Sequence, residues 1–157
     1  MSAVALSLGS NIGDKAARIR EAVERLVKSG AVKDAVVSSM YRTAPWGDVD
    51  QDWFVNACLA GETDIAPLEL LAVCKGIEQD MGRAHVRRWG PRIIDIDILY
   101  VGGTALDTPE LKLPHTEIFS RAFVLIPLAE IRPGLVIGGH DVSAAAAAIG
   151  SAGVTKM

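Results

Sequence analysis

The stretch Ile93-Ile94-Asp95-Ile96-Asp97-Ile98-Leu99-Tyr100 has the clearest strand pattern in the chain. Isoleucines alternate with aspartates, and successive side chains of a strand point to opposite faces of its sheet. The three even-numbered isoleucines are therefore expected to face the core. Asp95 and Asp97 are expected to share the other face, with their α-carbons about 6.5–7 Å apart. Two carboxylates placed in this way repel each other unless a cation lies between them.

Such a pair suits Mg²⁺, which takes one or two carboxylates and completes its shell with water and substrate phosphates. An isolated Asp-x-Asp pair is more often only the polar side of an amphipathic strand. The segment just before it favours the metal site, because it is rich in arginine and contains no acid between Asp80 and Asp95. Its arginines are Arg83, Arg87, Arg88 and Arg92. Guanidinium groups match phosphate geometry and keep their charge, so the two features together predict a site for a nucleotide polyphosphate. Trp89 offers a flat face for a base or a fused heterocycle.

Hydrophobic periodicity along the first 101 residues predicts the order strand, helix, strand, strand, helix, strand, in which the stretch above is the last strand. The predicted strands are 3–8, 32–41, 54–62 and 93–101, and the predicted helices are 15–29 and 67–81. This β-α-β-β-α-β order is typical of an α+β, ferredoxin-like antiparallel sheet with both helices on one face. The other face would then be free for a ligand. A C-terminal extension follows, with a short strand at 111–113 and helices at 121–130 and 143–148.

The 157 residues suit a single domain, 1–157, that needs no disulfide or structural metal. Cys58 and Cys74 lie in apolar stretches and are expected to be buried. A net charge of −3 argues against a general nucleic-acid binder, and no apolar run is long enough to span a membrane. We expect a cytoplasmic monomer that binds neither nucleic acid nor membrane.

The phosphate site is not a P-loop, because no Gly-x-x-x-x-Gly-Lys-Ser/Thr sequence occurs. The segment Gly9-Ser10-Asn11 follows the first strand but lacks the lysine. It is interpreted as a tight turn between a strand and a helix, with Asn11 or Asp14 capping that helix.

Several segments together resemble the 6-hydroxymethyl-7,8-dihydropterin pyrophosphokinase family, over roughly residues 3–137. The longest is Arg88-Trp89-Gly90-Pro91-Arg92-Ile93-Ile94-Asp95-Ile96-Asp97-Ile98, in which the tryptophan, the arginines and both aspartates follow the family's order. The others are Leu8-Gly9-Ser10-Asn11, Ser39-Met40-Tyr41-Arg42-Thr43-Ala44-Pro45, Phe54-Val55-Asn56-Ala57, Gly82-Arg83, Leu113-Pro114-His115, Arg121-Ala122-Phe123-Val124-Leu125 and Pro127-Leu128.

The resemblance implies transfer of pyrophosphate from ATP to 6-hydroxymethyl-7,8-dihydropterin, giving the pterin diphosphate and AMP in folate biosynthesis. It implies two Mg²⁺ ions, bound with ATP by Asp95 and Asp97, and catalytic roles for these aspartates with Arg83 and Arg92. The implied pterin-binding residues are Thr43, Pro45, Trp46, Phe54, Asn56, Trp89 and Phe123. The implied ATP-binding residues are Lys75, Arg83, Arg88, Trp89, Arg92, Ile98, His115 and Arg121.

The chain also departs from the family pattern. Its arginine segment is one residue shorter, Lys75 replaces a glutamine, Thr116 replaces a tyrosine, and the pattern stops near Gly138. Two rival functions are compatible with the same residues. One is another Mg²⁺-dependent nucleotidyl or phosphoryl transferase on the same fold, and the other is a ligand- or RNA-binding module without catalysis.

Overall fold

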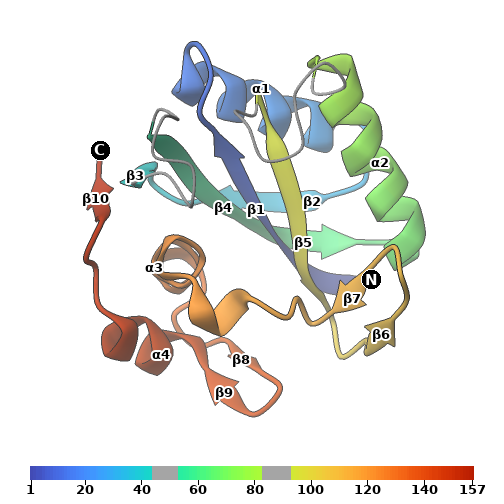
Figure 1. Ribbon diagram of the computed structural model, residues 1–157. Coiled ribbons are helices and arrows are strands. Elements are labelled where there is room, and N and C mark those ends of the chain that lie inside the picture. The colour runs from blue at the N-terminus through green and yellow to red at the C-terminus, as the bar shows by residue number, and fades with distance from the viewer. Residues whose placement is uncertain (44–52, 83–92) are drawn as a thin grey trace.

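The computed structural model describes residues 1–43, 53–82 and 93–157. An antiparallel sheet forms its centre, with strand order β10-β3-β4-β1-β5 and with β2 also pairing with β4 (Figure 1). The strands are β1 (Ser2–Ser10), β2 (Lys33–Val37), β3 (Tyr41–Thr43), β4 (Phe54–Thr63), β5 (Asp95–Val101) and β10 (Val154–Lys156). Because β1 lies between β4 and β5 and is antiparallel to both, the first residues of β4 and of β5 lie at the same end of the sheet.

Helices α1 (Lys15–Lys28) and α2 (Pro67–Asp80) cover one face of this sheet. The Asp14 carboxylate caps α1 by accepting a hydrogen bond from the backbone N–H of Ala17 at 3.2 Å, while Pro67 occupies the first turn of α2. Inward side chains of β1, β4 and β5 pack against the apolar stripes of both helices. The fully buried members of this core include Leu6, Leu8, Ile19, Leu26, Leu59 and Leu70.

The other face of the sheet is partly covered, which corrects the expectation of a free face. Helix α3 (Ala122–Ile131) packs against β4, and α4 (Val142–Ile149) packs against α3 (Figure 1). A second core forms there around Ala5, Cys58, Leu99 and Leu125. Because α3 itself is strongly apolar, it can bury a sheet face that the pattern of the first 101 residues leaves without a partner.

The remaining described elements are small. Strand β6 (Leu106–Asp107) pairs with β7 (Lys112–Leu113), β8 (Val136–Ile137) pairs with β9 (His140–Asp141), and a 3₁₀ turn, η2 (Ile118–Ser120), precedes α3. Within the described ranges, no helix is both long and apolar enough to cross a membrane.

Three features differ from the sequence-based expectation. The predicted strand 32–41 is two strands, β2 and β3, separated by residues 38–40. Strand β1 runs through Gly9 and Ser10, so these residues are not the turn that was expected. Strand β10 was not predicted, because its three residues gain their hydrogen-bond partners only from β3, more than a hundred residues earlier.

Candidate active site

The register of the sheet brings the predicted pterin and metal residues onto one face. Gly9 in β1 lies opposite Asn56 in β4 and opposite Asp95 in β5. One step along the strands, Ser7 lies opposite Cys58 and Asp97. Side chains paired across antiparallel strands share a face. Both aspartates therefore point to the side that also carries Asn56.

The alternation predicted for β5 is confirmed. Ile94, Ile96 and Ile98 are at most 2% exposed and belong to the core beneath α1 and α2, whereas Asp95 and Asp97 are half-buried. The side chain of Ile98 consequently faces away from the aspartates. Its predicted contact with ATP would have to come from its backbone.

Asn56 is buried and held in a fixed orientation, because its side-chain Nδ2 donates a hydrogen bond to Thr43 Oγ1 at 2.6 Å. A Cβ atom added at Gly9 would lie 2.8 Å from Asn56 Oδ1. Glycine is therefore required opposite this asparagine, since any side chain would displace the amide. The amide of Asn56, with one donor and one acceptor edge, is fixed by β1 on one side and by β3 on the other.

The electrostatics of Asp97 reflect its burial and the second carboxylate beside it. Burial and the neighbouring charge of Asp95 raise the pKa of Asp97 to about 6, although Arg121 and Lys75 act in the opposite direction. A half-buried carboxylate beside a second carboxylate is a poor arrangement in isolation. A divalent cation would relieve both effects, so the pair fits a metal. No group of three or more metal-binding side chains is found in the described parts of the chain, so such a cation would need further oxygen ligands, as Mg²⁺ takes from phosphates and water.

Glu78 in α2 is a residue that the sequence-based prediction missed. Its carboxylate is 1% exposed and accepts a hydrogen bond from the backbone N–H of Ile96, between the two aspartates, at 2.8 Å. Lys75 Nζ lies 3.4 Å from the other oxygen of Glu78. The bond attaches α2 to the edge strand that carries the acidic pair. The spacing of Leu70, Cys74 and Glu78, four residues apart on the buried stripe of the helix, was the available signal.

His115 and Arg121 come from the chain that follows β5. His115 Nδ1 accepts a hydrogen bond from the backbone N–H of Glu117 at 3.0 Å, which places the ring proton on Nε2. Burial and the nearby Arg121 charge lower the pKa of His115, so the ring stays neutral. Because Arg121 also acts on Asp97, these two donors lie near the acidic pair, where they could bind an anion.

Phe54 and Phe123 are half-buried residues at two edges of this region. Phe54 begins β4 opposite Thr43, and Phe123 lies in the first turn of α3, with the Arg121 guanidinium 5.7 Å from its ring centre. Both are therefore positioned by elements of the site. Six predicted residues lie outside the described residues: Pro45, Trp46, Arg83, Arg88, Trp89 and Arg92.

Comparison with known proteins gives a consistent family. The model of 7,8-dihydro-6-hydroxymethylpterin-pyrophosphokinase (HPPK) matches residues 5–133. A 2-amino-4-hydroxy-6-hydroxymethyldihydropteridine pyrophosphokinase of Methylorubrum extorquens is 50% identical over 157 residues, which cover 100% of this chain and 99% of that protein. The Pseudomonas aeruginosa protein of the same name is 42% identical over 132 residues, covering 84% of this chain and 82% of the relative.

Two further matches are longer proteins. A mitochondrial folate synthesis bifunctional protein of Arabidopsis thaliana is 44% identical over 128 residues, which cover 82% of this chain and 23% of the relative. A crystal structure described as HPPK-DHPS in complex with substrates superimposes with a TM-score of 0.75 at 14% identity, covering 94% of this chain and 43% of that one. The structural match supports the fold alone, whereas the family model and the close relatives support more. The chain belongs to the 7,8-dihydro-6-hydroxymethylpterin-pyrophosphokinase family.

Proposed function

We propose that this chain transfers the β,γ-pyrophosphoryl group of ATP to 6-hydroxymethyl-7,8-dihydropterin, giving the pterin diphosphate and AMP. The observation that carries the proposal is the pairing of Asn56 and Asp95 with the same residue of β1. It places an oriented amide, suited to the polar edge of a pterin, beside a dicarboxylate pair suited to a metal–triphosphate. The family and the names of its close relatives support the same reaction.

The pterin slot is proposed to lie between Phe54 and Phe123, with Asn56 at its polar edge. The bond from Asn56 Nδ2 to Thr43 Oγ1 supports this role, since it fixes which edge of the amide accepts and which donates. Aromatic rings on both sides of a flat heterocycle add stacking to the apolar burial. Pro45, Trp46 and Trp89 are proposed to complete the slot.

Asp95 and Asp97 are proposed to hold two Mg²⁺ ions that bind with ATP. When bound, the ions would neutralise the charge of the triphosphate oxygens. The charge and burial around Asp97 support this assignment. Lys75, Arg83, Arg88, Arg92, His115 and Arg121 are proposed as phosphate or nucleotide ligands, with Trp89 and the backbone of Ile98 beside the base or ribose.

The protein's own groups would then orient the two reactants. The hydroxymethyl oxygen attacks the β-phosphorus in line and a new O–P bond forms, while the hydroxyl proton is released to water. The bond from that phosphorus to the oxygen bridging it to AMP breaks, and its electron pair leaves with AMP. Phosphoryl transfer depends mainly on positioning and charge stabilisation. The guanidinium of Arg121 and the neutral His115, through its Nε2–H, can donate to phosphate oxygens, and Asn56 holds the pterin that carries the nucleophile.

Two observations support proposals about the whole chain. The sheet order supports a ferredoxin-like unit over the first 101 residues, with a C-terminal extension within one domain, 1–157. The lack of a membrane-crossing helix in the described ranges supports a cytoplasmic location. We also propose a monomer. The α3 helix covers much of the sheet face on which an RNA-binding module would stack bases, which disfavours that rival.

The product of the reaction tests the proposal. Purified protein incubated with ATP, Mg²⁺ and 6-hydroxymethyl-7,8-dihydropterin should release AMP in equal amount to the pterin diphosphate. Asp95→Ala should abolish turnover yet still bind pterin, while the control Asp107→Ala, whose carboxylate is 86% exposed, should retain activity. ADP as the product would identify an ordinary kinase, and full activity of Asp95→Ala would remove the metal site.

A further inference from the structure

The carboxylate of Glu130, near the end of α3, binds two residues that precede or begin β3. Its Oε2 accepts hydrogen bonds from the Ser39 backbone N–H at 2.9 Å and from Ser39 Oγ at 3.0 Å. Its Oε1 accepts a hydrogen bond from Tyr41 Oη at 2.5 Å. Three bonds from one carboxylate thus connect a helix to a strand about ninety residues away.

These two elements carry opposite parts of the proposed pterin slot. Thr43, two residues after Tyr41, lies at the far end of β3 and holds Asn56. Phe123 is seven residues before Glu130, which is two helical turns, so both side chains leave α3 on nearly the same stripe. A shift of α3 relative to β3 would therefore change the separation between Phe123 and the Thr43–Asn56 pair.

Glu130 and Tyr41 each keep one protonation state, which preserves the hydrogen bond between them. Partial burial raises the pKa of Glu130, but the hydrogen bonds from Tyr41 and Ser39 and the charge of Lys156 lower it by more. The pKa of Glu130 therefore lies below its usual value. Burial, together with the bond to Glu130, raises the pKa of Tyr41 to about 12. The carboxylate is therefore ionised and the phenol neutral throughout the physiological range. Charge-assisted hydrogen bonds of this kind are stronger than neutral ones.

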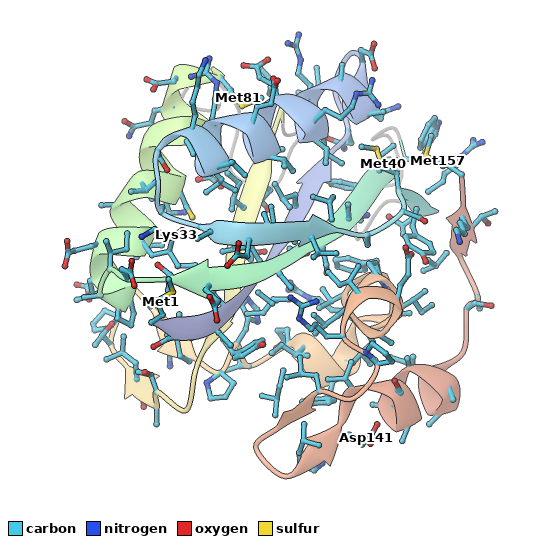
Figure 2. The ribbon with its side chains drawn as sticks, turned by 180° about the vertical axis from the view of Figure 1, so that it is seen from behind. Met1, Lys33, Met40, Met81, Asp141 and Met157 are labelled. Atoms are coloured by element: carbon cyan, nitrogen blue, oxygen red, sulfur yellow. The ribbon has the colours of Figure 1, made fainter. Side chains whose placement is uncertain are left out.

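Strand β10 supports β3 from its other edge. Val154, Thr155 and Lys156 pair with Thr43, Arg42 and Tyr41. The backbone N–H of Met157 donates to the Met40 carbonyl at 3.0 Å, and Figure 2 shows these two methionines side by side. Strand β3, only three residues long, is thus held by β4 and β10 at its edges and by Glu130 through the side chain of Tyr41.

We infer that Glu130 is a positioning residue for the pterin slot: it sets the separation between α3 and β3, and thereby the separation between Phe123 on one side of the slot and the Thr43–Asn56 pair at its polar edge. This inference rests on the proposed function. It differs from a general stabilising role, because it requires that loss of the carboxylate weakens pterin binding far more than nucleotide binding.

The test compares three variants with the unmodified chain. Glu130→Ala removes all three bonds. Glu130→Gln keeps one amide oxygen to accept from Ser39 or Tyr41, and Glu24→Ala removes an exposed helical glutamate as a control. The ligands are 6-hydroxymethylpterin, the oxidised analogue of the dihydropterin, and a non-hydrolysable ATP analogue with Mg²⁺, and the binding of each is measured separately by calorimetry. Steady-state KM and kcat with the dihydropterin complete the set.

We expect Glu130→Ala to weaken pterin binding and raise the pterin KM by about tenfold or more, with nucleotide binding within about twofold and a smaller effect on kcat. Glu130→Gln should recover part of the loss, and Glu24→Ala should match the unmodified chain. An unchanged pterin Kd in folded Glu130→Ala, or equal losses for both ligands, would overturn the inference. If Glu130→Ala does not fold, the same outcomes apply to Glu130→Gln and Tyr41→Phe. Failure of the unmodified chain to bind pterin would instead contradict the proposed function, and the inference with it.

Discussion

At the scale of single residues, the site depends on two positions where the strand pattern is unusual. Gly9 interrupts the apolar run of β1 so that Asn56 can occupy the space above it. Asp97 places a charge where the sheet is half-buried and where a second carboxylate lies nearby. Each is unfavourable for strand stability alone, and each is explained by a ligand that the site would hold.

Gly9→Ala should damage the pterin slot selectively. The added Cβ would lie 2.8 Å from Asn56 Oδ1, so the amide or the strand must move. We expect pterin affinity to fall by about tenfold or more and the free energy of unfolding to fall by about 1–3 kcal/mol. Gly103→Ala is the matched control, because a Cβ there has no neighbour within 4 Å. Calorimetry with 6-hydroxymethylpterin and urea denaturation measure both effects, and an unaffected pterin Kd would contradict the assignment.

Asp97 should make stability without metal depend on pH. Its folded-state pKa is raised to about 6 by burial and by Asp95, whereas an unfolded aspartate titrates near 3.9. Between these values the folded state holds a proton that the unfolded chain releases, so stability falls as the pH rises toward 6 and stays lower above it. In the presence of a chelator, Asp97→Asn should therefore be more stable than the unmodified chain by about 1–3 kcal/mol at pH 8. The difference should shrink toward pH 4 and be absent for Asp107→Asn; a difference independent of pH would contradict this account.

At the scale of elements, the short strands are stabilised by hydrogen bonds to neighbouring strands rather than by their own sequence. Strand β3 has three residues, and β10 has three. Neither would form alone, since isolated short strands are marginal in water. Strand β10 completes the sheet beside β3, so the end of the chain contacts the strand that carries Thr43.

Deletion of residues 151–157 should therefore weaken pterin binding more than nucleotide binding. Without β10, one edge of β3 loses its backbone partners and Thr43 is less well fixed. We expect a loss of pterin affinity of about threefold to tenfold, with the affinity for a non-hydrolysable ATP analogue within about twofold. Thr155→Ala keeps the backbone pairing and should bind both ligands normally. Parallel losses for both ligands would show that the deletion acts on the fold as a whole.

At the scale of the whole molecule, one sheet separates two hydrophobic cores. The core beneath α1 and α2 contains Leu6, and the core beneath α3 contains Leu125; both side chains are fully buried. Because β1, β4 and β5 contribute side chains to both cores, loss of either core exposes strands needed by the other. The described residues should therefore unfold as one cooperative unit.

Leu6→Ala and Leu125→Ala test this cooperativity. Each should lower the free energy of unfolding by about 2–5 kcal/mol. Each variant should still unfold in a single transition, shifted to lower denaturant concentration. Far-ultraviolet circular dichroism and tryptophan fluorescence should give the same midpoint for that transition. Two separated transitions in either variant would show that α3 and α4 form a unit that unfolds on its own.

The sequence by itself predicted most of the elements and the alternation of β5, and the structure confirms both. Periodicity and helix caps act over a few residues, and Ile94, Asp95 and Asp97 follow from them directly. The family resemblance supplied Thr43, Phe54, Asn56 and Phe123, which no local pattern marks as functional.

Only the tertiary structure decided which residues meet across the sheet. The pairing of Gly9 with Asn56 and Asp95, the bond from Ile96 to Glu78, and the contact of Glu130 with Tyr41 all depend on strand register and helix packing. Two further features also depend on tertiary packing: α3 covers the second face of the sheet, and β10 pairs with β3. These contacts join residues from different elements, and their energies arise only when the whole fold brings the partners together. A local pattern can therefore indicate that a residue such as Glu78 is buried, but it cannot identify the group that the residue contacts.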